Sequence, residues 1–167
     1  TLGKGKGKDL QILKELQFPH SIGLLYSTFT AFLGFEVNEG EYKVMGMAPY
    51  GTPRYVEQIW KLIQQSPDGS FWLDLDYFSF HRSTKHSFNS KFVAVFGEPR
   101  NPNIPFIVEQ ISTTDPLLYG GEDRKNICAY NQRYADIAAS IQFVCEDLIL
   151  KLALELYRMT GSKQLCM

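Results

Sequence analysis

Residues 40–51 read Gly-Glu-Tyr-Lys-Val-Met-Gly-Met-Ala-Pro-Tyr-Gly, a composition that is unusual for a helix in a protein core. Glycine and proline weaken an ordinary helix, so such a stretch is expected where the backbone comes close to another backbone or to a ligand. A carboxylate at its start, Glu41, could accept hydrogen bonds from the vicinal hydroxyls of a sugar, and the ammonium of Lys43 could meet a phosphate. The alternative is a surface helix in which both charges are merely solvated.

Helical geometry distinguishes the two charged residues. If the helix begins at Glu41, the side chains of Glu41 and Lys43 lie about 200° apart around its axis. They cannot contact the same ligand atom. We expect Glu41, which begins the turn, to face the ligand, and Lys43 is the weaker candidate, free to form an ion pair elsewhere.

The composition indicates one domain with a substantial core, since 44% of the 167 residues are hydrophobic and 14% are aromatic. The net charge of -1 provides no field that would attract nucleic acid or an anionic membrane. No apolar run is long enough to span a bilayer, and no signal-peptide pattern opens the chain. The alternating Gly-Lys repeat of residues 3–8 lacks the ending of a phosphate-binding loop and predicts a hairpin tip.

The cysteines and histidines provide no metal-binding pattern. The three cysteines are widely spaced, with no Cys-x-x-Cys or Cys/His arrangement, and they predict reduced thiols in a cytoplasmic protein. His81 and His86 are five residues apart, whereas metal ligands on a helix are separated by three or four, so we expect both at the surface. We therefore predict no metal site within these residues.

Two long helices are predicted from apolar spacing. The first covers residues 21–33, with Ser21 as its N-cap and Gly34 as its stop. The second covers residues 134–160, with Asp136 near its positive end and Gln142 beside the apolar seam, where a polar group needs a partner. A third helix is expected from Thr52, as its cap, to about residue 65.

Strands and loops complete the prediction of an α/β protein. Residues 10–18 and 70–75 are expected to be strands, and residues 67–69 a turn. The proline-rich segment 76–133 is expected to be an irregular insertion, with residues 91–96 forming a short helix or strand within it. The chain begins without methionine, and residues 164–167 resemble half of a buried strand. We expect residues 1–167 to form a single partial domain, incomplete at both ends.

Several phrases, in one order, resemble the O-carbamoyltransferases of nodulation-factor and antibiotic biosynthesis. The matching phrases are residues 18–27, 34–35, 40–51, 68–71, 136–142, 160–161 and 165–166. The resemblance covers most of residues 1–75 and 134–167.

The resemblance implies a nucleotide-binding domain of the actin/Hsp70/sugar-kinase fold, which is ribonuclease H-like. Such enzymes use ATP and carbamoyl phosphate to form carbamoyladenylate in a second domain of the same chain. The large domain then transfers the carbamoyl group to a hydroxyl of a small-molecule or sugar acceptor, with a divalent metal such as iron held by a histidine motif. In tRNA-modifying relatives a Gly-Glu segment followed by Lys lies beside the nucleotide's ribose. Gly40, Glu41 and Lys43 fall on that pattern, and Gly46 extends it as a small residue that would permit close approach.

The resemblance also implies parts that residues 1–167 do not contain. The histidine motif, the glycine-rich loop and the carbamoyladenylate-forming domain of the family match no part of this sequence. The catalytic residues are therefore unknown, and we expect these residues alone to lack transferase activity. The acceptor cannot be read from composition or motif. The alternative hypothesis is a non-catalytic relative, a binding or interaction module with residues 97–133 as its contact surface.

Overall fold

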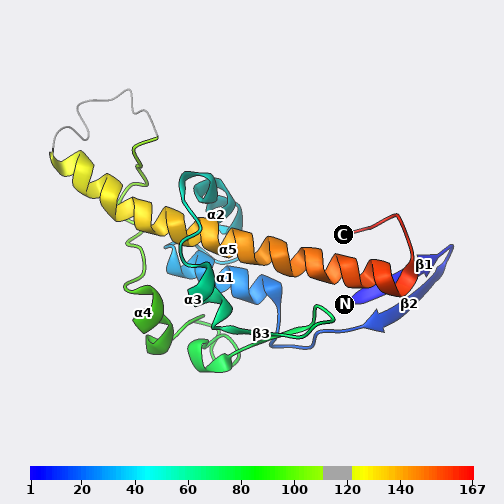
Figure 1. Ribbon diagram of the computed structural model, residues 1–167. Coiled ribbons are helices and arrows are strands. Elements are labelled where there is room, and N and C mark those ends of the chain that lie inside the picture. Colours follow the sequence, from blue (N-terminus) through cyan, green and yellow to red (C-terminus); the bar gives the residue numbers. More distant parts are fainter. Residues whose placement is uncertain (111–121) are drawn as a thin grey trace.

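One long helix organises the computed structural model, which describes residues 1–110 and 122–167. This helix, α5, spans Glu122–Thr160. The shorter helices α1 (Ile22–Phe32), α2 (Glu41–Met47) and α3 (Val56–Trp60) pack along its middle, as Figure 1 shows. The strands of the described residues form two separate two-stranded sheets. The described residues are therefore of mixed α/β structure with small sheets, which confirms the α/β part of the fold prediction.

Both sheets are antiparallel hairpins. Strands β1 (Leu2–Lys6) and β2 (Asp9–Lys14) pair from Lys6 opposite Asp9, across a turn in which Gly7 has a positive φ of 63°. The predicted Gly-Lys hairpin tip is thereby confirmed. Strands β3 (Ile63–Gln65) and β4 (Phe71–Leu73) pair across the predicted turn, where the N–H of Gly69 donates to the carbonyl of Ser66 at 3.0 Å.

Local signals place helix α1 as predicted. The hydroxyl oxygen of Ser21 accepts a hydrogen bond from the N–H of Leu24 at 3.4 Å, as an N-cap does. Gly34 follows the helix with a φ of +80°, a conformation that glycine adopts without strain. The hydroxyls of Thr28 and Thr30 donate to carbonyls one turn earlier, which satisfies them inside the buried face.

The helix predicted from Thr52 to about residue 65 is present but shorter, and both of its predicted limits are wrong. The observed α3 has Tyr55 as its N-cap, and residues 63–65 are strand β3. The N–H of Thr52 donates instead to the carboxylate of Asp136 on α5, at 2.8 Å. Pairing with β4, whose Phe71 and Leu73 are buried, replaces the helical continuation.

The start of the last helix is also corrected. It begins at Glu122 rather than near residue 134, so Asp136 lies in the middle of α5 and not at its positive end. The amide of Asn131 donates to the carbonyls of Pro105 and Ile107, at 2.8 and 3.1 Å, and holds this early part of the helix to the preceding loop. Such contacts link residues about 25 positions apart and leave no local pattern in the sequence.

The segment expected to be irregular contains regular structure. Residues Ser90–Phe96 form α4, and the side chain of Asn89 caps it by accepting from the N–H of Lys91 at 2.9 Å. A short 3-10 helix, η2, covers Leu75–Tyr77. Residues 111–121, which belong to the predicted contact surface 97–133, lie outside the described residues. Whether the segment is an insertion relative to the family stays a prediction.

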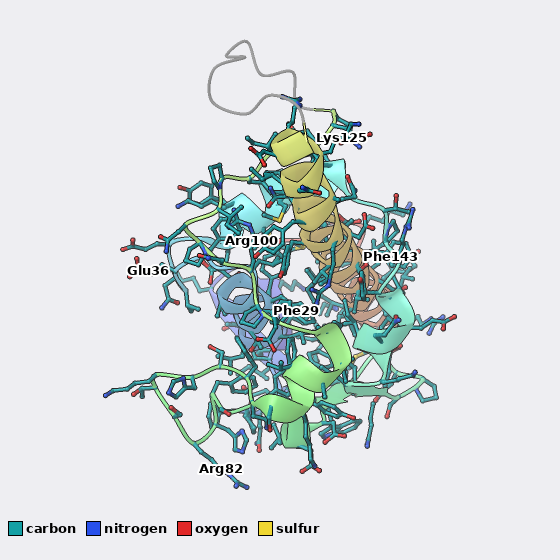
Figure 2. The ribbon with its side chains drawn as sticks, turned by 90° about the vertical axis from the view of Figure 1, so that its left-hand side faces the viewer. Phe29, Glu36, Arg82, Arg100, Lys125 and Phe143 are labelled. Carbon is teal, nitrogen blue, oxygen red and sulfur yellow. The ribbon has the colours of Figure 1, made fainter. Side chains whose placement is uncertain are left out.

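An aromatic cluster joins α4 to α1 in the core. The ring of Phe29 lies edge-on to Phe92 and Phe96, with centroid distances of 5.1 and 5.2 Å. Figure 2 shows Phe29 between the ribbons of α1 and α4. Phe32 makes similar contacts with both α4 rings. Helix α4 is thus part of the hydrophobic core.

Candidate functional site

The twelve residues 40–51, called the elbow below, have one buried and one exposed face. They form α2 and then η1, a 3-10 turn of Ala48–Tyr50. Val44 and Met47 are buried against the rest of the protein, whereas Tyr42 and Met45 are 67% and 53% exposed. The elbow therefore presents one helical face to solvent beside α1 and α5.

The three glycines of the elbow have different surroundings. A Cβ at Gly40 would lie 2.6 Å from the Cβ of Phe35, and one at Gly51 would lie 2.0 Å from the carbonyl oxygen of Ala135. Glycine is required at both positions by packing inside the protein. A Cβ at Gly46 would meet nothing within 4 Å, and this residue is exposed on α2. A glycine there costs about 0.5–1 kcal/mol of helix stability relative to alanine. No packing contact among the described residues requires it.

Glu41 is held at the start of the elbow. Its Oε1 accepts one hydrogen bond from the hydroxyl of Ser27, at 2.9 Å, and one from the N–H of Asn38, at 3.0 Å. Partial burial raises the pKa of Glu41, but the bonds from Asn38 and Ser27 and the nearby N–H groups of Glu41 and Gly40 outweigh it, so the pKa lies below its usual value. The carboxylate is therefore ionised and fixed in orientation at neutral pH.

The environment of Lys43 differs from that of Glu41. It is exposed, and its Nζ lies 5.9 Å from the ring centroid of Phe35 and 5.8 Å from that of Tyr42. These are cation–π distances, and no carboxylate of the described chain forms an ion pair with it. No contact joins Lys43 to Glu41, and an ammonium held only by ring faces can still turn toward an anion.

A chain of polar side chains beside Glu41 was not predicted as part of the site. The hydroxyl of Tyr26 donates to Oε1 of Gln142 at 2.9 Å, and Nε2 of Gln142 donates to Glu146 at 2.7 Å. Burial raises the pKa of Tyr26, with further contributions from the charges of Cys145, Glu146 and Glu41, so the hydroxyl stays protonated. The predicted need of Gln142 for a partner is confirmed. That partner, 116 positions away in the sequence, could not be named from a local pattern.

Asp136 fastens the far end of the elbow to α5. Its Oδ1 accepts from the N–H of Thr52 at 2.8 Å and from Nε2 of Gln132 at 3.0 Å. The same Gln132 amide donates to the carbonyl of Tyr50 at 3.0 Å. Asp136 is almost fully buried, and the exposed Arg54 approaches its other oxygen at 3.5 Å. Both ends of the elbow are therefore anchored before any ligand arrives.

The elbow places an ionised carboxylate next to an exposed helical face. An ionised carboxylate beside an open stretch of helix can accept hydrogen bonds from hydroxyl groups of a sugar. Among the described residues, no three His, Cys, Asp or Glu side chains are grouped as a metal site requires. Cys128, Cys145 and Cys166 are all free thiols. No helix in the described ranges has the length and hydropathy to cross a membrane.

Comparison with known proteins assigns the chain to one family. The chain belongs to the family described as carbamoyltransferase N-terminus, which matches residues 1–167. This confirms the resemblance inferred from the sequence phrases.

Three curated relatives cover nearly the whole chain. The uncharacterized protein sll1178 of Synechocystis sp. is 40% identical over 168 residues, which are 100% of this chain and 23% of that protein. The nodulation protein NolNO of Sinorhizobium fredii is 26% identical over 98% of this chain and 19% of its own length. The nodulation protein NolO of Bradyrhizobium diazoefficiens is 24% identical over 96% of this chain and 23% of its own length. The chain thus spans about a fifth of the length of these relatives.

Proposed function

We propose that this chain is part of an ATP-dependent O-carbamoyltransferase, which transfers a carbamoyl group from carbamoyl phosphate, through carbamoyladenylate, to a hydroxyl group of a small-molecule or sugar acceptor. The family match over residues 1–167 carries this proposal. In it, the described elements belong to a larger domain of the actin/Hsp70/sugar-kinase type in a cytoplasmic protein. The divalent metal and the carbamoyladenylate-forming domain belong to other parts of a longer chain.

The elbow has the nucleotide-binding role in this proposal. The Glu41 carboxylate accepts hydrogen bonds from the vicinal hydroxyls of the ribose, since it is ionised and already held in place by Ser27 and Asn38. Gly40 sets the start of the helix, and Gly46 leaves room for the ligand on the exposed face. Lys43 is the weaker member, placed to approach a phosphate oxygen.

Binding of the nucleotide serves the transfer step by positioning its leaving group. In that step the acceptor's oxygen forms a bond to the carbamoyl carbon and its hydroxyl proton passes to solvent, while the bond from this carbon to the phosphate oxygen of the adenylate breaks and AMP is released. A ribose held by the elbow fixes where the adenylate lies and hence where the carbonyl is presented. The anchored ends of the elbow, at Glu41 and at Asp136, suit this role because little ordering remains to be done on binding.

The test is Glu41→Gln in the full-length protein, with AMP affinity measured by isothermal titration calorimetry. The amide can still accept from Ser27 and Asn38, so the fold is retained while the charge is lost. We expect AMP binding to weaken by about 1–3 kcal/mol, as for loss of a charge-assisted hydrogen bond. Glu39→Gln is the matched control, since the exposed Glu39 side chain bonds to none of the described residues. Equal affinity in both variants and the parent removes Glu41 from the site.

A second measurement separates the enzyme from a non-catalytic relative. The full-length protein is incubated with ATP, carbamoyl phosphate and a panel of hydroxylated acceptors, and carbamoylated product is detected by mass spectrometry. Product formation supports the transferase. AMP binding without turnover of carbamoyl phosphate, across the panel and with divalent metal supplied, supports the binding module instead.

A further inference from the structure

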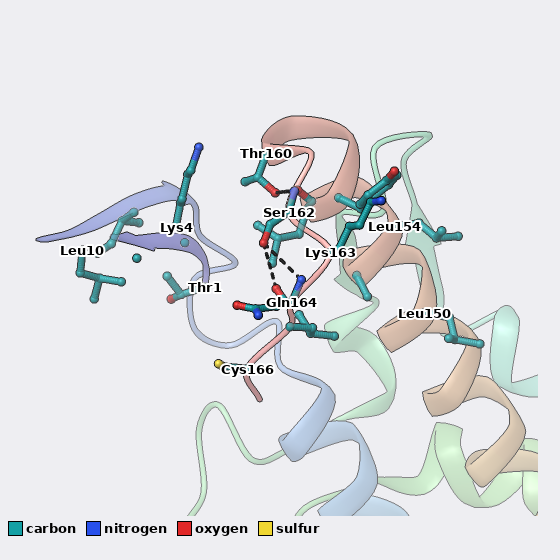
Figure 3. Close-up of a pocket in the computed structure, with 17 residues that line it drawn as sticks. Thr1, Lys4, Leu10, Leu150, Leu154, Thr160, Ser162, Lys163, Gln164 and Cys166 are labelled. Carbon is teal, nitrogen blue, oxygen red and sulfur yellow. Dashed lines mark hydrogen bonds between the residues drawn. The ribbon is translucent and has the colours of Figure 1, made fainter. Parts of the chain in front are cut away.

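An apolar groove lies at the opposite end of α5 from the elbow's anchor. It runs between the β1–β2 hairpin, the last turns of α5 and the residues that follow that helix, and it encloses about 740 Å³. Figure 3 shows these three segments around it. We call it the terminal groove. Its apolar lining comes mainly from Leu10, Ile12, Leu150, Leu154, Tyr157 and Leu165.

The terminal groove exposes large apolar side chains of α5 and of the hairpin. Leu150 and Leu154 are 62% and 55% exposed, whereas Ile141 and Leu148, earlier on the same helix, are fully buried. Leu10 on the hairpin is 76% exposed. A contiguous apolar patch of this kind marks an interaction surface in a folded protein.

The hairpin beside the groove also lacks support. A two-stranded hairpin is marginally stable by itself, and most residues of β1 and β2 are exposed. Its outer strand edges offer unpaired N–H and C=O groups to another segment. Lys4 and Lys163 line the groove, and no carboxylate does. This lining suits, as its occupant, an apolar segment without strong positive charge.

We propose that this occupant is polypeptide of the same chain, namely the segments that directly precede Thr1 and follow Met167 in a full-length protein of the relatives' size. Both ends of the described chain lie beside the hairpin and the end of α5, as Figure 1 shows. The curated relatives extend well beyond the matched region, which is 19–23% of their length. A segment tethered at the groove has an effective concentration in the millimolar range, so it outcompetes a second copy of the protein.

This inference does not depend on the nucleotide proposal, and a native thiol tests it. Cys166 lines the groove and is exposed in the structure. In the full-length protein we measure its rate of modification by N-ethylmaleimide, using peptide mass spectrometry. The reference is the thiol introduced by Glu39→Cys in an exposed loop. We expect Cys166 to react at least about 100-fold more slowly than the reference.

A pair of variants at one position sharpens the test. Leu154→Asp places a charge in the covered groove and is expected to release the protection of Cys166, whereas Leu154→Met keeps an apolar side chain and is expected to retain it. Modification of Cys166 in the parent at the rate of the reference thiol overturns the proposal. Protection that disappears on dilution also overturns it, because it assigns the groove to a second copy.

Discussion

The two faces of the elbow differ more than their shared sequence suggests. On the inner face, Val44 is fully buried and Gly51 contacts the backbone of α5 at Ala135. On the outer face, Met45 is exposed and Gly46 has open space where a side chain would be. Gly51, like Gly40, is thus a position where the protein fills the space that a side chain would need, whereas at Gly46 that space is open. The same substitution at the two positions should therefore change stability in opposite directions.

The largest expected effect is that of Gly51→Ala on the inner face. The new Cβ would lie 2.0 Å from the Ala135 carbonyl oxygen, so the backbone of the elbow or of α5 must move. We expect the free energy of unfolding to fall by about 3 kcal/mol, at the upper end of the range for overpacked cores. Urea denaturation followed by circular dichroism measures it. A loss below about 1 kcal/mol would show that the contact yields easily.

The next effect is that of Asp136→Ala, which removes the anchor of the inner face. The N–H of Thr52 and the amide of Gln132 lose their buried acceptor, and we expect a loss of about 2–3 kcal/mol in the same denaturation experiment. Asp136→Asn is the control, because its carbonyl oxygen can still accept from Thr52. If both variants lose the same stability, the charge rather than the acceptor is what the elbow requires.

The difference between the two faces of the elbow also shows which parts of the fold could be predicted from the sequence. The limits of α1 follow from residues at its own ends, Ser21 and Gly34, so composition and spacing suffice. The twelve residues of the elbow were likewise recognised by their own glycines and proline. Its division into two faces depends on Ala135, more than 80 positions away, and no local pattern contains that contact.

The incorrect predictions also arise from contacts between residues far apart in the sequence. Thr52 has the residue type of a helix cap, but its N–H is bound to Asp136 on α5 and the helix begins only after Tyr55, while pairing with β4 makes residues 63–65 a strand. At the candidate site, the position of Glu41 at the start of the helix is visible in the sequence. Its partner Ser27 depends on packing between α1 and α2, and the chain from Tyr26 to Glu146 depends on packing between α1 and α5. Side chains on separate helices meet only once the helices are packed, which is why sequence periodicity missed them.

A smaller effect of opposite sign is expected for Gly46→Ala on the outer face. The added methyl group meets no neighbour, and alanine favours a helix, so we expect the free energy of unfolding to rise by about 0.5–1 kcal/mol. If the proposed ribose site is correct, the same variant binds AMP more weakly in the full-length protein. A gain in stability with unchanged AMP affinity would confirm the open space and move the ligand away from this face.

The smallest effect is the acid dependence that Glu41 contributes at the junction of the elbow and α1. Its pKa in the folded protein is below the ordinary value of 4.5, so the unfolded chain takes up a proton at higher pH than the folded protein does. The stabilisation from this carboxylate is therefore fully present above pH 4.5 and is lost as the pH falls through the lower, folded value. We expect the difference in Tm between the parent and Glu41→Gln to be largest near pH 7 and to shrink in the acid range, while Glu39→Gln follows the parent throughout. A difference that stays constant with pH would mean that the ionised and the protonated carboxyl group of Glu41 hold Ser27 and Asn38 equally well. The charge of Glu41 would then have no structural role in the folded protein.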